Sequence, residues 1–547
     1  MKKRQVVALT LGMAMMATCI PAIAAEDEVV TLTYFNSDGK EEDPWTNPVA
    51  TALTEATGVK IELQYPVTSD AESIALMIAD DEYPDMIFAK GNAGSLYDAG
   101  AFIDMEPLID EYAPNIKEFY GEEYNKLRWS AEDTGIYQLS YYEIGNSALE
   151  TSGTCQIQYA ALKENDWVYP TTLEEYEALI KKYLEAHPTT EDGQEMIGIS
   201  LSAADWHWYI TLSNPAGFIA DAHPDNGQWF VDEEYNCMYK HTTENEKEYY
   251  RWLNRMYNEG ILDPNWSTQT HEDYIAKISS GRVVAIMDAA WDYAEAETVL
   301  LADGKMEQTY AALPVTLSAD QQCASLQYQG MGVGWGVGIT KDCEDPVAAI
   351  KFLDYLCTDE GQVLINWGIE GTHYFYDEDG NRYRTEEEIL ASQTDPDYNK
   401  NTGIGYYVGN GWPRYSNGVL DATGQPVTRS TKESLIAEYN DIEKEAVAAW
   451  GVESLADIFP QASDFEIMPY SAIWAYQYPT ELSDTIAILD EIAWPALINM
   501  VNGAPEDFDA AWDAMQEEFK DNGLEDANAG MTEFIAGKIA QNTASAE

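Results

Sequence analysis

The periodicity of hydrophobic and polar positions predicts a β-α-β-α-β unit in the first part of the chain. β-rich runs alternate with segments of helical spacing, and each helix opens on a residue that suits an N-cap. Asn47 is followed by Pro48 at the first helical position, where the missing proline N–H costs nothing. Strands that are joined through helices in this way lie parallel in one sheet, with right-handed crossover connections. The expected strands are 29–35, 59–65 and 85–89, and the expected helices begin after Asn47 and after Ser69, where Glu72 completes a capping box.

The middle and the end of the chain show mainly helical spacing, interrupted by short strands. In the run 330–340 glycine alternates with larger residues, so one face of that strand is bare backbone, suited to close approach by a helix or a ligand. Asp379-Gly380 predicts a tight hairpin turn. Further helices are expected at 173–184, 246–259, 271–280, 345–357, 359–367 and 508–519, and strands at 197–201 and 282–287.

The chain is strongly acidic, with 30 basic and 96 acidic residues and a formal net charge of -66. Nucleic acid is excluded as a partner, because binding to phosphates needs basic patches. Hydrophobic residues make up 45% of the chain, which indicates a folded protein with a large core rather than a disordered one. We interpret the charge as a source of solubility and self-repulsion at a cell surface.

The first residues have the order of a secretory signal: a basic start, an apolar run at 6–18 and the small-residue site Ala22-Ile23-Ala24. The run is too short to span a bilayer. We expect residues 1–25 to be a signal peptide and the protein to be exported to the extracellular cell surface. Cys19 loosely resembles a lipidated cysteine, so the mature protein is secreted or lipid-anchored, with cleavage after Ala24 favoured.

Five cysteines remain after such cleavage, and no two of them form a C-x-x-C pair. The sequence therefore shows no zinc or redox motif. An odd number forbids complete internal pairing, and whether one disulfide forms stays open. The cysteines are Cys155, Cys237, Cys323, Cys343 and Cys357.

Four segments, in this order along the chain, resemble family 1 of the extracellular solute-binding proteins of bacterial ABC transporters. The last segment is similar to a signature of the subgroup that includes oligosaccharide-binding lipoproteins of Gram-positive bacteria. The segments are Tyr83-Pro84-Asp85 in its strand, 278–287 with Trp291, 345–356 with 358–361, and Trp367-Gly368-Ile369-Glu370-Gly371-Thr372-His373-Tyr374.

The resemblance implies an α/β, two-lobed periplasmic-binding-protein-like fold with crossing hinge segments. It further implies a monomer that is not an enzyme, needs no cofactor, closes over a carbohydrate and docks on ABC permease subunits. Some relatives carry a calcium loop, but 187–195 lacks most of its oxygen ligands, so we expect no metal. The expected parts are 1–25, signal peptide; 26–145, N-terminal lobe; 146–280, C-terminal lobe; 281–340, crossover returning to the N-terminal lobe; and 341–547, C-terminal lobe with C-terminal helices.

A cleft for a sugar needs aromatic platforms for the C–H faces and a few hydrogen-bonding groups. The sequence offers such residues at expected strand ends and in turns, although packing in a core is the alternative for each aromatic. Trp412 and Trp474 are further aromatics that the sequence does not place. The candidate ligand-binding residues are Asn36, Lys90, Trp206, Trp208, Trp291, Trp335, Glu370, His373 and Tyr374.

Two other functions compete with transport. A secreted glycoside hydrolase would need two suitably spaced carboxylates, but with 96 acidic residues any spacing can be found. No G-x-S-x-G elbow, H-E-x-x-H motif or P-loop is present. A surface sensor that feeds a receptor kinase would have the same cleft and differ only in its partner. The order of the four segments favours the transport protein.

Overall fold

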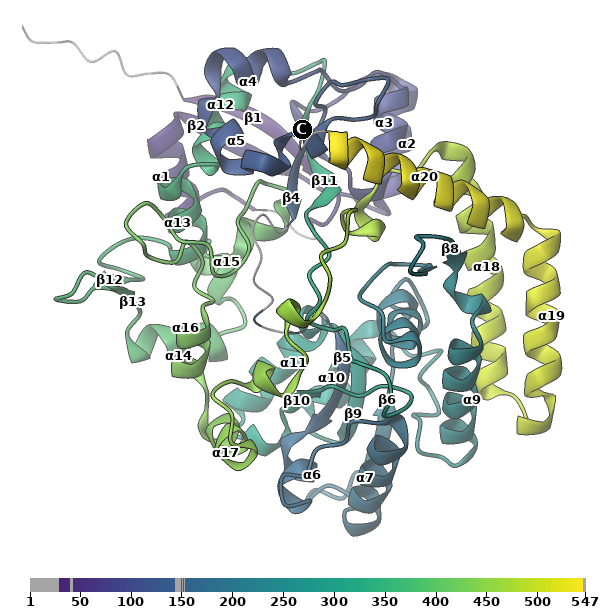
Figure 1. The fold of residues 1–547 in the computed structure, drawn as a ribbon. Helices are drawn as coiled ribbons and strands as arrows, with labels where there is room; N and C mark the ends of the chain where they lie inside the picture. Colours follow the sequence, from purple (N-terminus) through teal and green to yellow (C-terminus); the bar gives the residue numbers. More distant parts are fainter. Residues whose placement is uncertain (1–28, 40–42, 143–148, 150, 152, 545–547) are drawn as a thin grey trace, which may run out of the picture.

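The computed structural model describes residues 29–39, 43–142, 149, 151 and 153–544, and Figure 1 shows them as two α/β halves. The expected signal peptide and Cys19 lie outside the described residues. One half holds a five-stranded sheet of order β2-β1-β3-β11-β4, and the other a four-stranded sheet of order β10-β5-β9-β6. The expected two-lobed α/β fold is confirmed.

The first lobe opens with the expected parallel unit: β1 (Val30–Asn36) pairs in parallel with β2 (Val59–Gln64) and β3 (Met86–Phe88). Helix α1 (Pro48–Thr57) starts where its cap predicts, because the Asn47 side chain accepts a hydrogen bond from the Ala50 N–H at 2.9 Å. Gly58 ends this helix in the left-handed conformation. Helix α2 (Asp70–Asp80) begins after Ser69 in the same way.

The second lobe is built around β9 (Val283–Asp288), which pairs in parallel with β6 (Ile197–Ser200) and antiparallel with β5 (Thr154–Gln158). β10 (Tyr310–Leu313) completes the sheet beside β5. The expected crossover 281–340 is therefore wrong in its first part. Both β9 and β10 stay in the second sheet, since periodicity marks a strand without naming its partner.

Only β11 (Gly332–Ile339) returns to the first lobe, where it lies antiparallel to β3 and to β4 (Leu139–Tyr142). The glycine positions of β11 have no room for a side chain, because backbone from other segments lies directly against them. A Cβ on Gly334 would lie 1.8 Å from the carbonyl oxygen of Ala475, and one on Gly336 would lie 2.1 Å from that of Leu139. The expected close approach is confirmed, with the chain itself as the approaching group.

The expected assignment of 341–547 to the second lobe needs a similar correction. Helices α12 (Pro346–Leu356) and α13 (Asp359–Trp367) pack in the core of the first lobe, with Ile350 and Leu364 among the buried side chains. The C-terminal helices α18 (Thr480–Asn502) and α19 (Phe508–Asp521) pack in the second core. The expected boundary between 145 and 146 lies outside the described residues.

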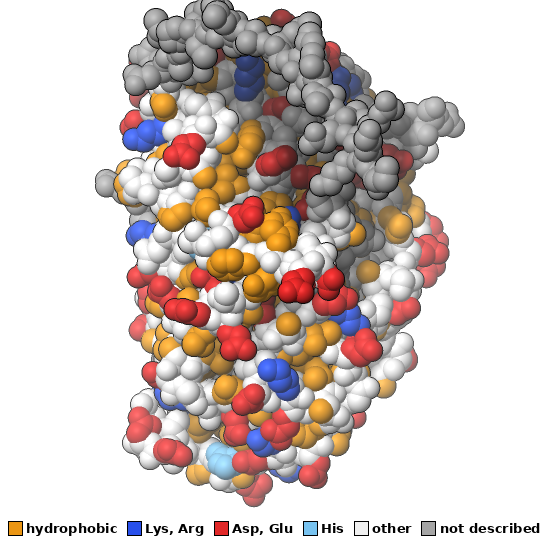
Figure 2. Space-filling view, turned by 90° about the vertical axis from the view of Figure 1, so that its left-hand side faces the viewer, with side chains coloured by type: hydrophobic (Ala, Val, Ile, Leu, Met, Phe, Trp, Pro, Cys, Tyr) orange, Lys and Arg blue, Asp and Glu red, His pale blue; other side chains and the backbone are white. Residues whose placement is uncertain are grey.

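The predicted apolar face of α19 packs in the core, as expected. The predicted hairpin turn at Gly380 is also confirmed, because β12 and β13 pair antiparallel on either side of it. All five cysteines considered above are free thiols. Of the helices described, none is both long and apolar enough to cross a membrane. Figure 2 shows many Asp and Glu side chains and few Lys and Arg side chains on one face of the molecule.

The other described elements mostly surround the two sheets. They are α3 (Ala93–Asp98), α4 (Glu106–Tyr112), α5 (Pro114–Tyr120), α6 (Tyr159–Glu164), α7 (Leu173–Ala186), α8 (Asn214–Ala216), β7 (Trp229–Val231), β8 (Cys237–Tyr239), α9 (Glu244–Asn258), α10 (His271–Ser279), α11 (Ala290–Ala302), β12 (Phe375–Tyr376), β13 (Arg382–Tyr383), α14 (Glu386–Thr394), α15 (Tyr398–Thr402), α16 (Lys432–Glu438), α17 (Asp441–Trp450) and α20 (Leu524–Ala544).

Candidate functional site

The strand directions place one edge of each sheet at the crossing segments. In the first sheet β4 ends, and β11 begins, beside the carboxyl ends of β1 and β3. In the second sheet Thr154 at the start of β5 pairs with Asp288 at the end of β9, and Leu313 at the end of β10 pairs with Cys155. The chain therefore leaves and enters both sheets at their carboxyl edges. Ligands of open α/β sheets bind at such edges.

Two exposed tryptophans mark the carboxyl edge of the second sheet. Trp206 follows β6 and is 51% exposed, and Trp291 follows β9 and is 59% exposed. Their rings are nearly parallel, 8° apart in orientation, with centroids separated by 6.3 Å. No other tryptophan that the structure describes is as exposed. The pair forms an apolar platform of the kind that the C–H face of a sugar covers.

A second cluster lies at the carboxyl edge of the first sheet. Lys90 follows β3, binds Asp38 at 2.6 Å and places its ammonium nitrogen 5.1 Å from the centre of the Trp335 ring. Trp335 meets Trp474 edge to face, with centroids 5.1 Å apart. The side-chain oxygen of Asn36, at the end of β1, accepts a hydrogen bond from the Asp38 N–H. The structure thus brings three predicted residues to one edge.

The sequence did not place Trp474, because its segment contacts this edge only through tertiary structure. Gln477 fixes that segment: its side-chain amide donates to the carbonyl oxygens of Lys90 and Gly334, at 3.1 and 2.9 Å. The amide oxygen of Gln477 also accepts from the Gly94 N–H. A segment from near the end of the chain therefore locks the start of β11 to the loop after β3.

Trp208 does not join the exposed pair. It is 2% exposed and stacks on Trp494, with ring planes 5° apart and centroids separated by 6.1 Å, inside the core of the second lobe. Packing in a core, the alternative that the sequence leaves open for each candidate aromatic, holds for this residue. A ligand has no access to its ring in this conformation.

His373 and Tyr374 point into their own turn. The ring Nδ1 of His373 accepts a hydrogen bond from the Ile369 N–H at 3.0 Å, and burial lowers the pKa of this histidine. Tyr374 packs edge to face on Trp367 under the guanidinium of Arg382, and burial raises its pKa to about 12. Glu370 stays exposed. These contacts tie the end of α13 to the β12–β13 hairpin, a structural task.

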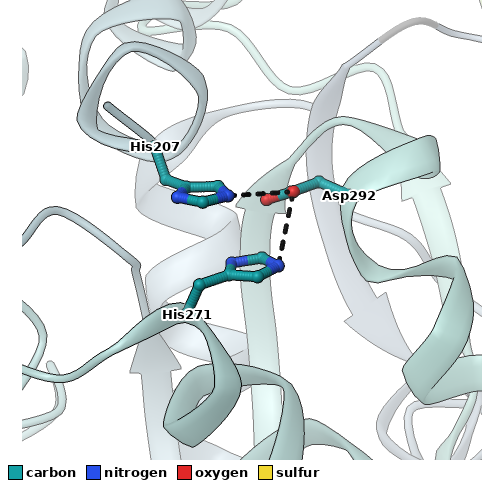
Figure 3. A group of neighbouring side chains, drawn as sticks. All are labelled: His207, His271 and Asp292. Atoms are coloured by element: carbon teal, nitrogen blue, oxygen red, sulfur yellow. Dashed lines mark ion pairs between the residues drawn. The ribbon is translucent and has the colours of Figure 1, made fainter. Parts of the chain in front are cut away.

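The structure also brings together three side chains that are not among the candidate residues predicted from the sequence. They form a possible metal site, although no metal was expected. His207, His271 and Asp292 turn one potential ligand atom each toward a common point, with all three atoms within 4.8 Å of one another (Figure 3). They come from the loop after β6, the start of α10 and the first turn of α11. No spacing motif links them, because they are far apart in the sequence.

The comparison with known families decides where the chain belongs. The sequence model described as "Bacterial extracellular solute-binding protein" matches residues 49–368, more than half of the chain. The chain belongs to this family. The expected resemblance is thereby confirmed, and the family is one of substrate-binding proteins rather than enzymes.

Individual relatives of this solute-binding protein are distant. The fructooligosaccharide ABC transporter substrate-binding protein FusA of Streptococcus pneumoniae is 22% identical over 342 residues, 60% of this chain. The chain spans 61% of the length of each of the two curated relatives it matches.

Solved structures agree over almost the whole fold. FusA of S. pneumoniae in complex with kestose has a TM-score of 0.67 at 18% identity, covering 94% of this chain and 99% of its own. An "HMO binding" solute-binding protein from Bifidobacterium longum infantis has a TM-score of 0.64 at 15% identity, with the same coverage. At these identities the likeness establishes the two-lobed fold.

Proposed function

We propose that this solute-binding protein captures an oligosaccharide outside the cell and delivers it to the permease subunits of an ABC importer. The observation that carries the proposal is the exposed Trp206–Trp291 pair at the edge where the second sheet meets the crossing segments. Exposed, parallel indole rings have no role in a core, and they match the apolar face of a sugar ring. The sugars named for the related FusA and HMO-binding proteins are consistent with this ligand class.

In this mechanism the ligand lies between the two carboxyl edges. Trp206 and Trp291 stack on the sugar rings from the second lobe. Lys90 offers a polar group from the first lobe, and Trp335 adds a ring from the crossing strand. Asn36 is 5% exposed and accepts from the Asp38 N–H, so its part is to hold the residue that pairs with Lys90. Contacts with both lobes favour the closed arrangement over the open one, so the ligand shifts the population toward closed. The permease then recognises the closed protein.

Export follows from the expected signal peptide, with a tether at Cys19 or release after cleavage at Ala24 as the two routes. We propose that the mature protein acts as a monomer, because two lobes of one chain supply both sides of the cleft. No group in this scheme breaks a bond, so we propose no enzymatic activity.

Isothermal titration against oligosaccharides of different linkage, including fructo-oligosaccharides and milk oligosaccharides, tests the proposal. Reducing ends are assayed in the same samples. We expect saturable binding of at least one sugar without new reducing ends. Release of reducing ends would instead support the glycoside hydrolase, and absence of binding across the panel would contradict the carbohydrate ligand.

A further inference from the structure

We propose that His207, His271 and Asp292 form a binding site for a divalent transition-metal ion of the zinc type, next to the tryptophan pair. The site needs no sugar, and it goes beyond the function proposed above. Two imidazoles and one carboxylate are ligands that Zn²⁺ commonly uses in proteins.

The distances fit such an ion. The Nε2 atom of His207 and the Nε2 atom of His271 each lie 3.6 Å from the same Asp292 oxygen, as the dashed lines in Figure 3 show. Around a tetrahedral ion with bonds of 2.0–2.2 Å, ligand atoms are about 3.3 to 3.6 Å apart. Both histidine–Asp292 distances therefore match those between two ligands of one ion.

The carboxylate of Asp205 positions His207 as a metal ligand. Asp205 lies 2.5 Å from the Nδ1 atom of His207 and also accepts a hydrogen bond from the backbone N–H of that residue. This contact orients the ring so that its Nε2 atom faces Asp292. Carboxylate–histidine–metal arrangements have this form.

The two imidazoles lie against each other. Their rings stack with centroids 3.9 Å apart and planes 5° apart. Both Nε2 lone pairs must point at one ion, so at least one ring tilts out of this stack when the metal binds.

The scaffold holds the ligands on rigid elements. His271 is the first residue of α10, whose N-cap Thr270 accepts a hydrogen bond from the Asp273 N–H. Asp292 lies in the first turn of α11 directly beyond β9, and its side chain is buried. Three protein ligands leave a fourth position for water, as in open zinc sites. The Trp206 ring stacks on the His207 ring with centroids 3.9 Å apart, so the proposed site adjoins the tryptophan pair.

Metal titration of the full-length chain, first treated with a chelator, tests the site. Titration calorimetry with ZnCl₂ is expected to give one ion per chain, with a dissociation constant of the order of 10⁻⁶ M or lower. Co²⁺ in its place should give the strong visible absorption of a tetrahedral ion. His271→Ala should weaken zinc binding at least about 100-fold, and Asp205→Asn, which removes only the carboxylate behind His207, about 10- to 100-fold.

His187→Ala is the matched control, because His187 is an exposed histidine that pairs with Glu164 instead. It should bind zinc as the unaltered chain does. Circular dichroism and the sugar titration show whether His271→Ala is folded, and Asp205→Asn gives an independent measure if it is not. Absence of zinc binding, or equal affinity in the folded His271→Ala and Asp205→Asn variants, would overturn the site. Both outcomes concern only the metal site, because sugar binding is measured in a separate titration.

Discussion

At the scale of single residues, Trp291 differs from most aromatics of this chain because its ring is exposed at the end of a strand rather than packed in a core. Trp206 beside it is similarly exposed, while Trp208, two positions further on, is fully packed. Trp206 stacks with the exposed Trp291, whereas Trp208 stacks on Trp494 in the core of the second lobe. Solvent exposure therefore identifies the pair on which we base ligand binding.

Trp291→Ala is expected to weaken oligosaccharide binding by roughly 1–4 kcal/mol, the cost of losing a buried anchor in the complex. Isothermal titration with the sugar identified by the panel measures it. Tyr383→Ala, which removes an exposed aromatic from the β12–β13 hairpin, is the control and should leave affinity unchanged. Equal affinity in the folded Trp291 variant would remove this residue from the site.

A buried pair predicts how stability depends on pH. Nδ1 of His241 lies 2.7 Å from a carboxyl oxygen of Glu246, and both side chains are inaccessible to solvent. Burial raises the pKa of Glu246 to about 8 and lowers that of His241 to about 3, so the pair is neutral, with the protonated carboxyl donating to the ring. The nearby Lys240 opposes the rise of the Glu246 pKa and adds to the fall of the His241 pKa. Burial and the neighbouring Glu246 raise the pKa of Asp221 to about 7.

Glu246 binds its proton more tightly in the folded state, so its contribution is present at low pH and lost as pH rises toward 8. His241 acts oppositely, but only below its ordinary pKa of 6.5. Between pH 6.5 and 8 the free energy of unfolding should therefore fall, and less so in Glu246→Gln. Urea denaturation at the two pH values compares the slopes. Identical slopes in both proteins would contradict a protonated Glu246.

At the scale of elements, β11 is the strand on which the site depends. It crosses into the first lobe, carries Trp335 and has Lys90 and Gln477 bound at its start. Its glycines allow the backbone at Ala475 to lie directly against it. The segment that bears Trp474 is held in place by this contact.

Gly334→Ala is expected to lower the free energy of unfolding by about 1–3 kcal/mol or more, because the new methyl group would overlap the Ala475 carbonyl. Gly537→Ala is the contrasting control. Gly537 lies in α20 with no atom within 4 Å of its added Cβ, so alanine should stabilise the helix by up to about 1 kcal/mol. Urea denaturation measures both. A Gly334 variant as stable as the unaltered chain would show that the strand can move away.

Capping residues in the sequence predicted where helices begin and end. Asn47 and Gly58 mark the two ends of α1, and Thr172 is the N-cap of α7, because a cap acts on backbone groups only a few residues away. Partners of strands could not be predicted in this way. β9 was identified as a strand, yet its place between β5 and β6 depends on residues far along the chain.

At the scale of the whole molecule, the proposed function requires the two lobes to move. The crossing segments enter both sheets at the edges that carry the candidate ligand groups, so a ligand there contacts parts of the chain on either side of the hinge. Differential contact with the closed form is what shifts the population.

Saturating oligosaccharide is therefore expected to reduce the radius of gyration in small-angle X-ray scattering. The control is a sugar from the panel that does not bind, which should leave the curve unchanged. Trp291→Ala should need a higher sugar concentration for the same compaction. Binding without any change in the scattering curve would argue against lobe closure.

Local patterns and composition were enough to predict most local elements, the parallel opening unit, the acidic character and the order of segments that identifies the family. These depend on neighbours along the chain or on composition, which a sequence displays directly. Tertiary structure alone decided which tryptophan is exposed, which sheet receives β9 and β10, and that His207, His271 and Asp292 meet. Each of these depends on contacts between distant segments, and such contacts form only when the whole core is packed.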